Sequence, residues 1–128
     1  MSVFDSYTRH MSYPTRAYAA FDTTSDLRPH TILRRDVKSH DVRIDVEFEG
    51  ICHSDIHTVN GDWGPQPYPV VPGHEVIGRV AEVGESVKKF KVGDLVGVGV
   101  FVDSCGECVA CKDHREQHCA NGPVWTYG

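Results

Sequence analysis

Four cysteines near the end of the sequence have the residue type and the spacing of a metal site. They follow the pattern Cys-x2-Cys-x2-Cys-x7-Cys, at Cys105, Cys108, Cys111 and Cys119. Four clustered thiolates can close a tetrahedral shell around zinc, and a shell filled by protein ligands is structural. We therefore predict a structural zinc lobe over residues 103–121, in which the metal replaces an apolar core that this polar stretch lacks.

Two other uses of these cysteines fit the sequence less well. An iron-sulfur cluster of the bacterial ferredoxin type places its fourth cysteine after three residues and before a proline, whereas Cys119 comes after seven and precedes Ala120. Disulfides are the second alternative, but the chain has five cysteines, an odd number, and no apolar signal segment opens it. We therefore expect a reducing, cytoplasmic setting.

A second set of possible metal ligands consists of Cys52, His74 and Glu75, each at an end of a predicted strand. A thiolate, an imidazole and a carboxylate suit zinc, and three protein ligands leave one coordination position open. Spacing alone does not show that these strand ends meet in space. A buried core cysteine beside an unrelated surface His-Glu pair therefore remains an open alternative.

The elements that must position these residues are predicted to be short strands. Residues 42–52 alternate between apolar and charged types, which predicts a strand. Its inner face would carry Val42, Ile44, Val46, Phe48, Gly50 and Cys52. Further strands are predicted at 16–21, 31–35 and 76–84, and a short helix is predicted to begin at His53.

Length and composition describe one ordinary globular domain. The chain has 128 residues, a hydrophobic content of 40% and a formal net charge of -5. This mild charge predicts no nucleic-acid surface, and no apolar run approaches the roughly eighteen residues of a membrane span, so we expect a soluble protein. Residues 1–12 are polar and lack periodicity, which predicts an extension or tag before a domain at 13–128.

Several of these motifs together resemble the zinc-dependent medium-chain alcohol dehydrogenases. They are the segment 50–55 (Gly-Ile-Cys-His-Ser-Asp), the segment 73–75 (Gly-His-Glu), the pair at 93–94 (Gly-Asp) and the four-cysteine lobe. The amino-acid sequence is most similar to the cinnamyl alcohol dehydrogenase and broad aldehyde reductase branch of this family, and the resemblance covers residues 16–128. It implies a mainly β fold with short helices, a GroES-like irregular barrel that carries a projecting zinc lobe. The Rossmann domain of the family is absent from this chain.

The resemblance also implies roles for individual residues. Cys52 and His74 would be ligands of a catalytic zinc ion, and Glu75 would either bind the metal or exchange with substrate or water. Asp55 would support this ligand shell through a hydrogen bond to His74. From the residue types alone, Ser54 and Asp55 could equally be a helix cap.

A proton relay and a substrate pocket are the remaining implied features. Ser54 would accept a hydrogen bond from the zinc-bound alcohol or relay its proton, and His57 would pass that proton towards solvent. Trp63, in a loop rich in turn-forming residues, would line the substrate pocket. The sequence alone leaves two alternatives open, a solvated surface histidine at His57 and a tryptophan at position 63 that only covers the edge of the domain.

For the family, the resemblance implies two zinc ions per full subunit and NADP in preference to NAD. The resemblance implies that the cofactor would be bound by the domain that this chain lacks. In agreement, residues 97–99 do not form a phosphate loop, and the sequence contains no other nucleotide motif. The partners implied are a small alcohol or aldehyde, with no nucleic acid and no membrane, and full-length relatives are often dimeric or tetrameric. The chain alone would be inactive, and a non-catalytic zinc-binding fragment is the alternative function.

Overall fold

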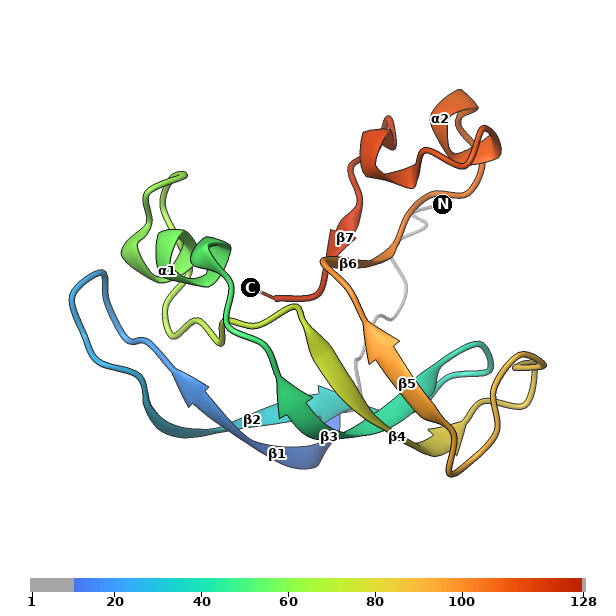
Figure 1. Cartoon of the computed structure of the whole chain (residues 1–128), viewed down its shortest axis with the longest axis horizontal. Coiled ribbons are helices and arrows are strands. Elements are labelled where there is room, and N and C mark those ends of the chain that lie inside the picture. The colour runs from blue at the N-terminus through green and yellow to red at the C-terminus, as the bar shows by residue number, and fades with distance from the viewer. Residues whose placement is uncertain (1–10, 128) are drawn as a thin grey trace, which may run out of the picture.

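The computed structural model describes residues 11–127, and their side chains from Tyr13 onward. This part of the chain is mainly β, with three small antiparallel sheets and few helical residues (Figure 1). The strands are β1 (Met11–Ala19), β2 (Arg28–Arg35), β3 (Val42–Glu49), β4 (Val76–Val83), β5 (Leu95–Val98), β6 (Phe101–Asp103) and β7 (Val124–Trp125). The helices are α1 (His53–Asn60), α2 (Val109–Lys112) and the 3-10 helix η1 (Glu116–His118).

Within each sheet, strands that are consecutive in the chain pair antiparallel. β1 pairs with β2, the order of the three-stranded sheet is β3-β4-β5, and β6 pairs with β7. An isolated bridge in which Ala20 and Val70 exchange two backbone hydrogen bonds of 2.9 Å ties the first hairpin to the segment before β4. Both residues are almost fully buried. The fold class predicted from the sequence is therefore confirmed.

The predicted inner face of the segment 42–52 is wrong at Val46 and Phe48. A register shift between Val46 and Phe48 places Phe48 opposite Ile77 on β4. Since directly paired residues of antiparallel strands lie on the same face, the shift moves Phe48 to the face opposite that of Ile44, which pairs with the buried Val80. Phe48 is accordingly 68% exposed, and Val46, which precedes this shift, is also exposed, at 59%.

Element boundaries also differ from the predictions. β3 ends at Glu49, so Cys52 is not a strand residue but the residue that caps α1. β1 begins at Met11, where it pairs with Arg35, and β2 begins at Arg28, three residues before the strand predicted at 31–35. Pro29 lacks a backbone N–H, but it is tolerated in β2 because this sheet has only two strands, so β2 forms backbone hydrogen bonds along one edge only. The predicted extension otherwise lies outside the described residues.

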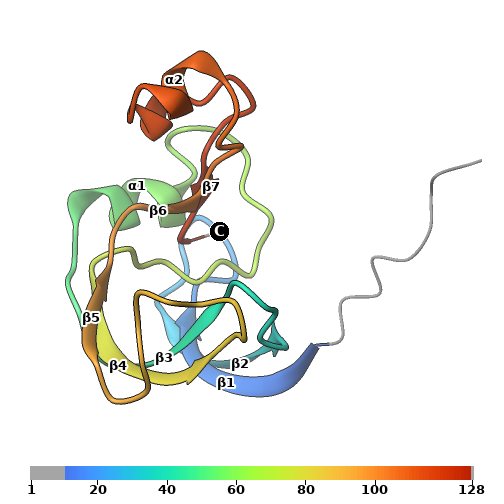
Figure 2. The same ribbon diagram turned by 90° about the vertical axis from the view of Figure 1, so that its right-hand side faces the viewer.

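The segment 103–121 projects from the sheets as a separate lobe (Figure 2). It leaves the sheets through β6 and returns through β7, and its own secondary structure consists only of α2 and η1. Among the described residues, no helix is long and apolar enough to cross a membrane.

One surface ion pair supports a pH prediction. Asp41 accepts hydrogen bonds from the Arg35 guanidinium and from the backbone N–H of Lys38, and the Arg35 hydrogen bond chiefly lowers the pKa of Asp41 to about 2. We expect Asp41→Asn to lower the free energy of unfolding by about 1 kcal/mol at pH 7, because both side chains are partly exposed. This difference from wild type should persist down to about pH 4 and vanish as the pH falls through 2, measured by urea unfolding.

Candidate metal centres

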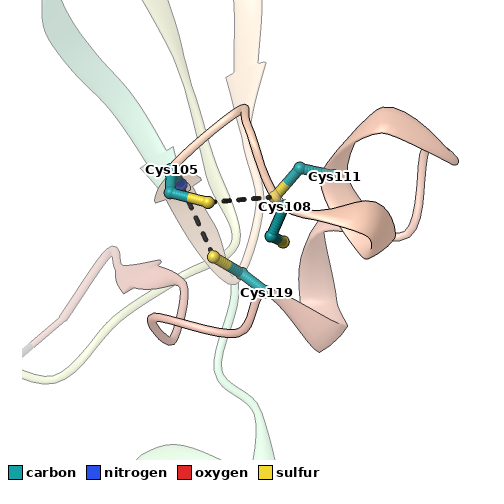
Figure 3. Close-up of side chains that lie close together, drawn as sticks. All are labelled: Cys105, Cys108, Cys111 and Cys119. Carbon is teal, nitrogen blue, oxygen red and sulfur yellow. Dashed lines mark hydrogen bonds between the residues drawn. The ribbon is translucent and has the colours of Figure 1, made fainter.

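The four cysteines of the lobe converge although Cys119 is separated from the first three by η1. Cys105 follows β6, Cys108 caps α2, Cys111 lies within α2, and Cys119 follows η1. Their sulfur atoms all lie within 4.8 Å of one another (Figure 3). The two short helical turns therefore bring the last ligand of the motif back to the first three.

The distances fit a tetrahedral metal site. The sulfur atoms of Cys105 and Cys111 are 3.9 Å apart. Zinc–sulfur bonds of about 2.3 Å in a tetrahedron place sulfur atoms about 3.8 Å apart. All four thiols are free, and Cys111 and Cys119 are buried, so no disulfide competes for them. The donor set and its spacing therefore fit a zinc ion.

Backbone amides already prepare these sulfur atoms to carry negative charge. The N–H of Cys105 donates to Cys119 Sγ and that of Ala120 donates to Cys108 Sγ, each at 3.5 Å. The Ala120 hydrogen bond chiefly lowers the pKa of Cys108, to about 6. A Ser104 hydrogen bond lowers the pKa of Cys111, but burial and the neighbouring Cys108 outweigh it and raise the pKa to about 11. Crowded thiolates repel one another, and a divalent cation relieves that repulsion.

The second cluster brings together residues that are more than twenty positions apart. Cys52 caps the start of α1, while His74 and Glu75 immediately precede β4. One ligand atom of each lies within 4.8 Å of the others. The link is the pairing of β3 with β4, extended by a 2.9 Å hydrogen bond from the Gly50 N–H to the Glu75 carbonyl. Among the described residues, this cluster and the four-cysteine lobe are the two groups able to hold a metal ion.

Asp55 organises the second cluster from a buried position. Its carboxylate accepts hydrogen bonds from the backbone N–H of Cys52 at 2.9 Å, from the N–H of Gly73 at 3.1 Å and from His74 Nδ1 at 3.1 Å. Because a carboxylate accepts, Nδ1 of His74 carries the proton and Nε2 keeps a lone pair for a metal. Asp55 thus orients the ring of His74 and also caps α1.

The protonation of Cys52 and His74 is linked. Hydrogen bonds from the backbone and side chain of Ser54, and then from His74, lower the pKa of Cys52. Burial lowers the pKa of His74, but the hydrogen bond to Cys52 and the charge of Asp55 outweigh it and raise the pKa above its usual value. Both shifts stabilise the charged forms of the two side chains, the Cys52 thiolate and the His74 imidazolium, relative to their usual pKa values.

The remaining predicted site residues lie along α1 and just beyond it. The Ser54 hydroxyl is 3.5 Å from Cys52 Sγ, so it lies at the cluster. His57 stacks against Trp63 with ring centroids 5.2 Å apart, and its Nδ1 is 2.8 Å from a carboxylate oxygen of Asp62. Trp63 itself is 62% exposed. The roles of these residues remain predictions.

Sequence reasoning missed Asp62. A left-handed Gly61, with φ of 71°, ends α1 and turns the chain back, and the Asp62 N–H then donates to the His57 carbonyl at 3.0 Å. This turn brings the Asp62 side chain onto His57. The asparagine-glycine pair at 60–61 was the available signal, because glycine just after a helix marks such a turn.

Gly50 leaves the space that the Glu75 side chain occupies. A Cβ atom at position 50 would lie 2.9 Å from Glu75 Cβ and would overlap its carboxylate. We expect Gly50→Ala to displace Glu75, to lower the free energy of unfolding by about 2 kcal/mol and to weaken zinc binding at the second cluster about tenfold. Urea unfolding and chelator competition would measure the two effects.

Gly99→Ala is the matched control for Gly50→Ala. Nothing lies within 4 Å of a Cβ atom built at Gly99, so this variant should unfold within about 0.5 kcal/mol of wild type. Equal behaviour of the two alanine variants would show that Glu75 does not depend on the space at Gly50.

Comparisons with known proteins place the chain in a family. The family described as the alcohol dehydrogenase GroES-like domain matches residues 38–128. The chain is 60% identical over 112 residues to NADP-dependent alcohol dehydrogenase C 1 of Mycolicibacterium smegmatis, which covers 87% of the chain and 32% of the relative. It is 49% identical over 120 residues to mannitol dehydrogenase of Apium graveolens, covering 92% and 33%. The chain therefore spans about a third of the length of these relatives.

Solved structures support the same assignment. The cinnamyl alcohol dehydrogenase of Sorghum bicolor superposes with a TM-score of 0.86 at 46% identity, covering 90% of this chain and 32% of that one. The CAD of Helicobacter pylori in complex with NADP(H) superposes with a TM-score of 0.84 at 48% identity, covering 87% and 32%. From its sequence match, its fold and its relatives, the chain belongs to the alcohol dehydrogenase GroES-like domain family.

Proposed function

We propose that this chain is the zinc-binding catalytic domain of an NADP-dependent dehydrogenase that interconverts a small alcohol and its aldehyde. The observation that carries the proposal is the second cluster, in which Cys52, His74 and Glu75 converge and leave a coordination position open. The names of the relatives support NADP over NAD. The four-cysteine lobe would hold a second, structural zinc ion, giving two per chain.

In this proposal the ligand set is Cys52 Sγ, His74 Nε2 and, bound or exchanging, the Glu75 carboxylate. When bound, zinc supplies Lewis acidity toward the oxygen of an alcohol or aldehyde, and NADP(H) accepts or supplies the hydride. Asp55 holds the proton of His74 on Nδ1, so the lone pair of Nε2 stays available for the metal.

α1 supplies the path for the proton that oxidation of an alcohol releases. Ser54 lies beside Cys52, and His57 is three residues further on, so the two side chains share one face of the helix. Ser54 Oγ would take the proton of the alcohol and pass it to His57. Asp62 binds Nδ1 of His57, so Nε2 is the atom that receives the proton, and the side chain is 38% exposed for its release.

The cellular setting and partners follow from the same chemistry. We propose a reducing compartment, the cytoplasm, because all five cysteines are free thiols that metal binding requires. The substrate would be a small molecule, and neither nucleic acid nor a membrane takes part. A dimer or tetramer of the complete enzyme, as the sequence resemblance implies, is also part of the proposal.

The test joins residues 13–128 to the remaining two thirds of the Mycolicibacterium smegmatis relative. We expect this chimera to oxidise primary alcohols with NADP, and expect Cys52→Ser to lower kcat/KM by about a thousandfold while the protein stays folded. Elemental analysis should find two zinc ions per wild-type chain and one in Cys52→Ser. A folded chimera whose activity does not depend on Cys52 would overturn the proposal, and a chain that holds only the lobe zinc would favour a non-catalytic zinc-binding domain.

A further inference from the structure

The ring of His74 has a second neighbour that neither the sequence patterns nor the proposed ligand set includes. Tyr127 packs against it, with ring centroids 4.9 Å apart and ring planes inclined by 42°. His74 is only 7% exposed, although the next residue, Glu75, is exposed. We propose that Tyr127 is a positioning residue that holds His74 in the orientation for metal binding and couples the four-cysteine lobe to the second cluster. This inference rests on the proposed zinc function of that cluster.

The contact completes the restraint on the imidazole. The hydrogen bonds of His74 to Asp55 and Cys52 act at the edge of the ring, so they leave its two faces unsupported and still allow the ring to tilt out of its plane. An aromatic ring packed at 4.9 Å blocks this tilt and excludes water from the face it covers. Nε2, on the far side of the ring from Asp55, then has one favoured direction. Loss of the hydrogen-bonded partners that orient a ligating histidine typically lowers metal affinity by about ten- to a hundredfold, and we expect the lower end of this range for a packed ring.

Tyr127 reaches His74 only because the chain returns from the lobe. β6 leads into the lobe and β7 leads out of it, and the two strands pair through Phe101 opposite Trp125. Thr126 continues this pairing by donating its backbone N–H to the Val100 carbonyl at 3.2 Å and its hydroxyl to the Gly99 carbonyl. Figure 1 shows this end of the chain beside β6, between the lobe and α1. The next residue is Tyr127, so the pairing of β7 decides where its ring lies.

The lobe is therefore connected mechanically to the second cluster. Closing the lobe around a metal holds Cys105, just after β6, close to Cys119, which precedes β7 by a few residues. That closure sets the distance between the two strands at the point where they pair. When the lobe opens, β7 loses this restraint and Tyr127 loses its fixed place on His74. The four-cysteine lobe and the second cluster share no ligand, but the β6–β7 pair and the ring of Tyr127 couple them.

The experiment compares three variants of the 128-residue chain, with substitutions at positions 125 and 127. Tyr127→Leu removes the ring on His74, Tyr127→Phe keeps it, and Trp125→Leu makes the same change at a ring that is 55% exposed. Zinc affinity is measured by chelator competition, and the imidazole protons of His74 are followed by NMR in metal-free and zinc-loaded protein. We expect Tyr127→Leu to bind the zinc ion of the second cluster at least about tenfold less tightly than wild type and to shift the His74 proton signals. Tyr127→Phe and Trp125→Leu should match wild type in both readouts.

A double-mutant cycle with Cys105→Ser tests the coupling. We expect Cys105→Ser to shift the His74 signals in the same direction and to weaken the second site by a similar factor. Combining it with Tyr127→Leu should add little, because both changes remove the same contact. Equal zinc affinity and unchanged His74 signals in Tyr127→Leu would overturn the positioning role, and additive losses in the cycle would overturn the coupling.

These results separate the inference from the proposed function. A wild-type chain that holds one zinc ion, in the lobe alone, would overturn the proposed function. The His74 signals of the metal-free protein would still show whether Tyr127 packs on the ring. A wild-type chain that holds two zinc ions, with the second unaffected by Tyr127→Leu, would leave the proposed function standing and overturn the inference.

Discussion

Replacement of Cys105 with serine is expected to remove one zinc ion per chain and to unfold the segment 103–121. The lobe has little that could hold it together without a metal, because α2 has four residues and η1 has three. Its buried apolar side chains are Cys111 and Cys119, which are themselves ligands in the proposed site. Structural zinc contributes about 10 kcal/mol or more of apparent binding free energy near neutral pH, and that contribution is also the folding free energy of such a lobe.

Elemental analysis and limited proteolysis would measure these two effects. Zinc should fall from two ions per chain to at most one, and new cleavage should appear within 103–121. Cys52→Ser is the control, because it makes the same chemical change in the second cluster and should leave the lobe resistant to protease. A Cys105→Ser chain that keeps its full zinc content and a resistant lobe would contradict the proposed structural role.

Replacement of Asp55 with asparagine is expected to have the largest effect of any substitution outside the ligands. The carboxylate is buried and accepts three hydrogen bonds, from Cys52 N, Gly73 N and His74 Nδ1. An amide offers one oxygen acceptor, and its NH₂ group would face a donor. Leaving a buried donor unpaired and weakening bonds to a charged group should lower the free energy of unfolding by about 3 kcal/mol. Zinc affinity at the second cluster should fall by about ten- to a hundredfold.

Asp62→Asn is the matched control for this prediction. Asp62 also binds a histidine, but its side chain is 45% exposed, so the change in the free energy of unfolding should stay below about 0.5 kcal/mol. Urea unfolding and chelator competition on both variants would separate the buried carboxylate from the exposed one. Similar losses in the two variants would show that Asp55 does not organise the cluster.

Local patterns were sufficient for the parts of this protein that depend on neighbouring residues. The spacing of the four cysteines predicts a lobe whose sulfur atoms do converge, because tight turns bring residues a few positions apart together. The cap at the start of α1 and the alternation that forms β4 follow from similarly short-range rules. The fold class itself was predictable, since the motifs of the family lie within such local segments.

Only the tertiary structure decided where distant segments meet. Alternation along 42–52 did not reveal the register shift that exposes Phe48, because a bulge depends on the partner strand and not on the strand's own pattern. The convergence of Cys52 with His74 and Glu75 depends on the β3–β4 pairing, and the place of Tyr127 depends on β7 returning from the lobe. The sequence by itself determined which residues have the side chains to hold a metal, and long-range strand pairing decided which of them lie close together, because that pairing depends on contacts that no local segment contains.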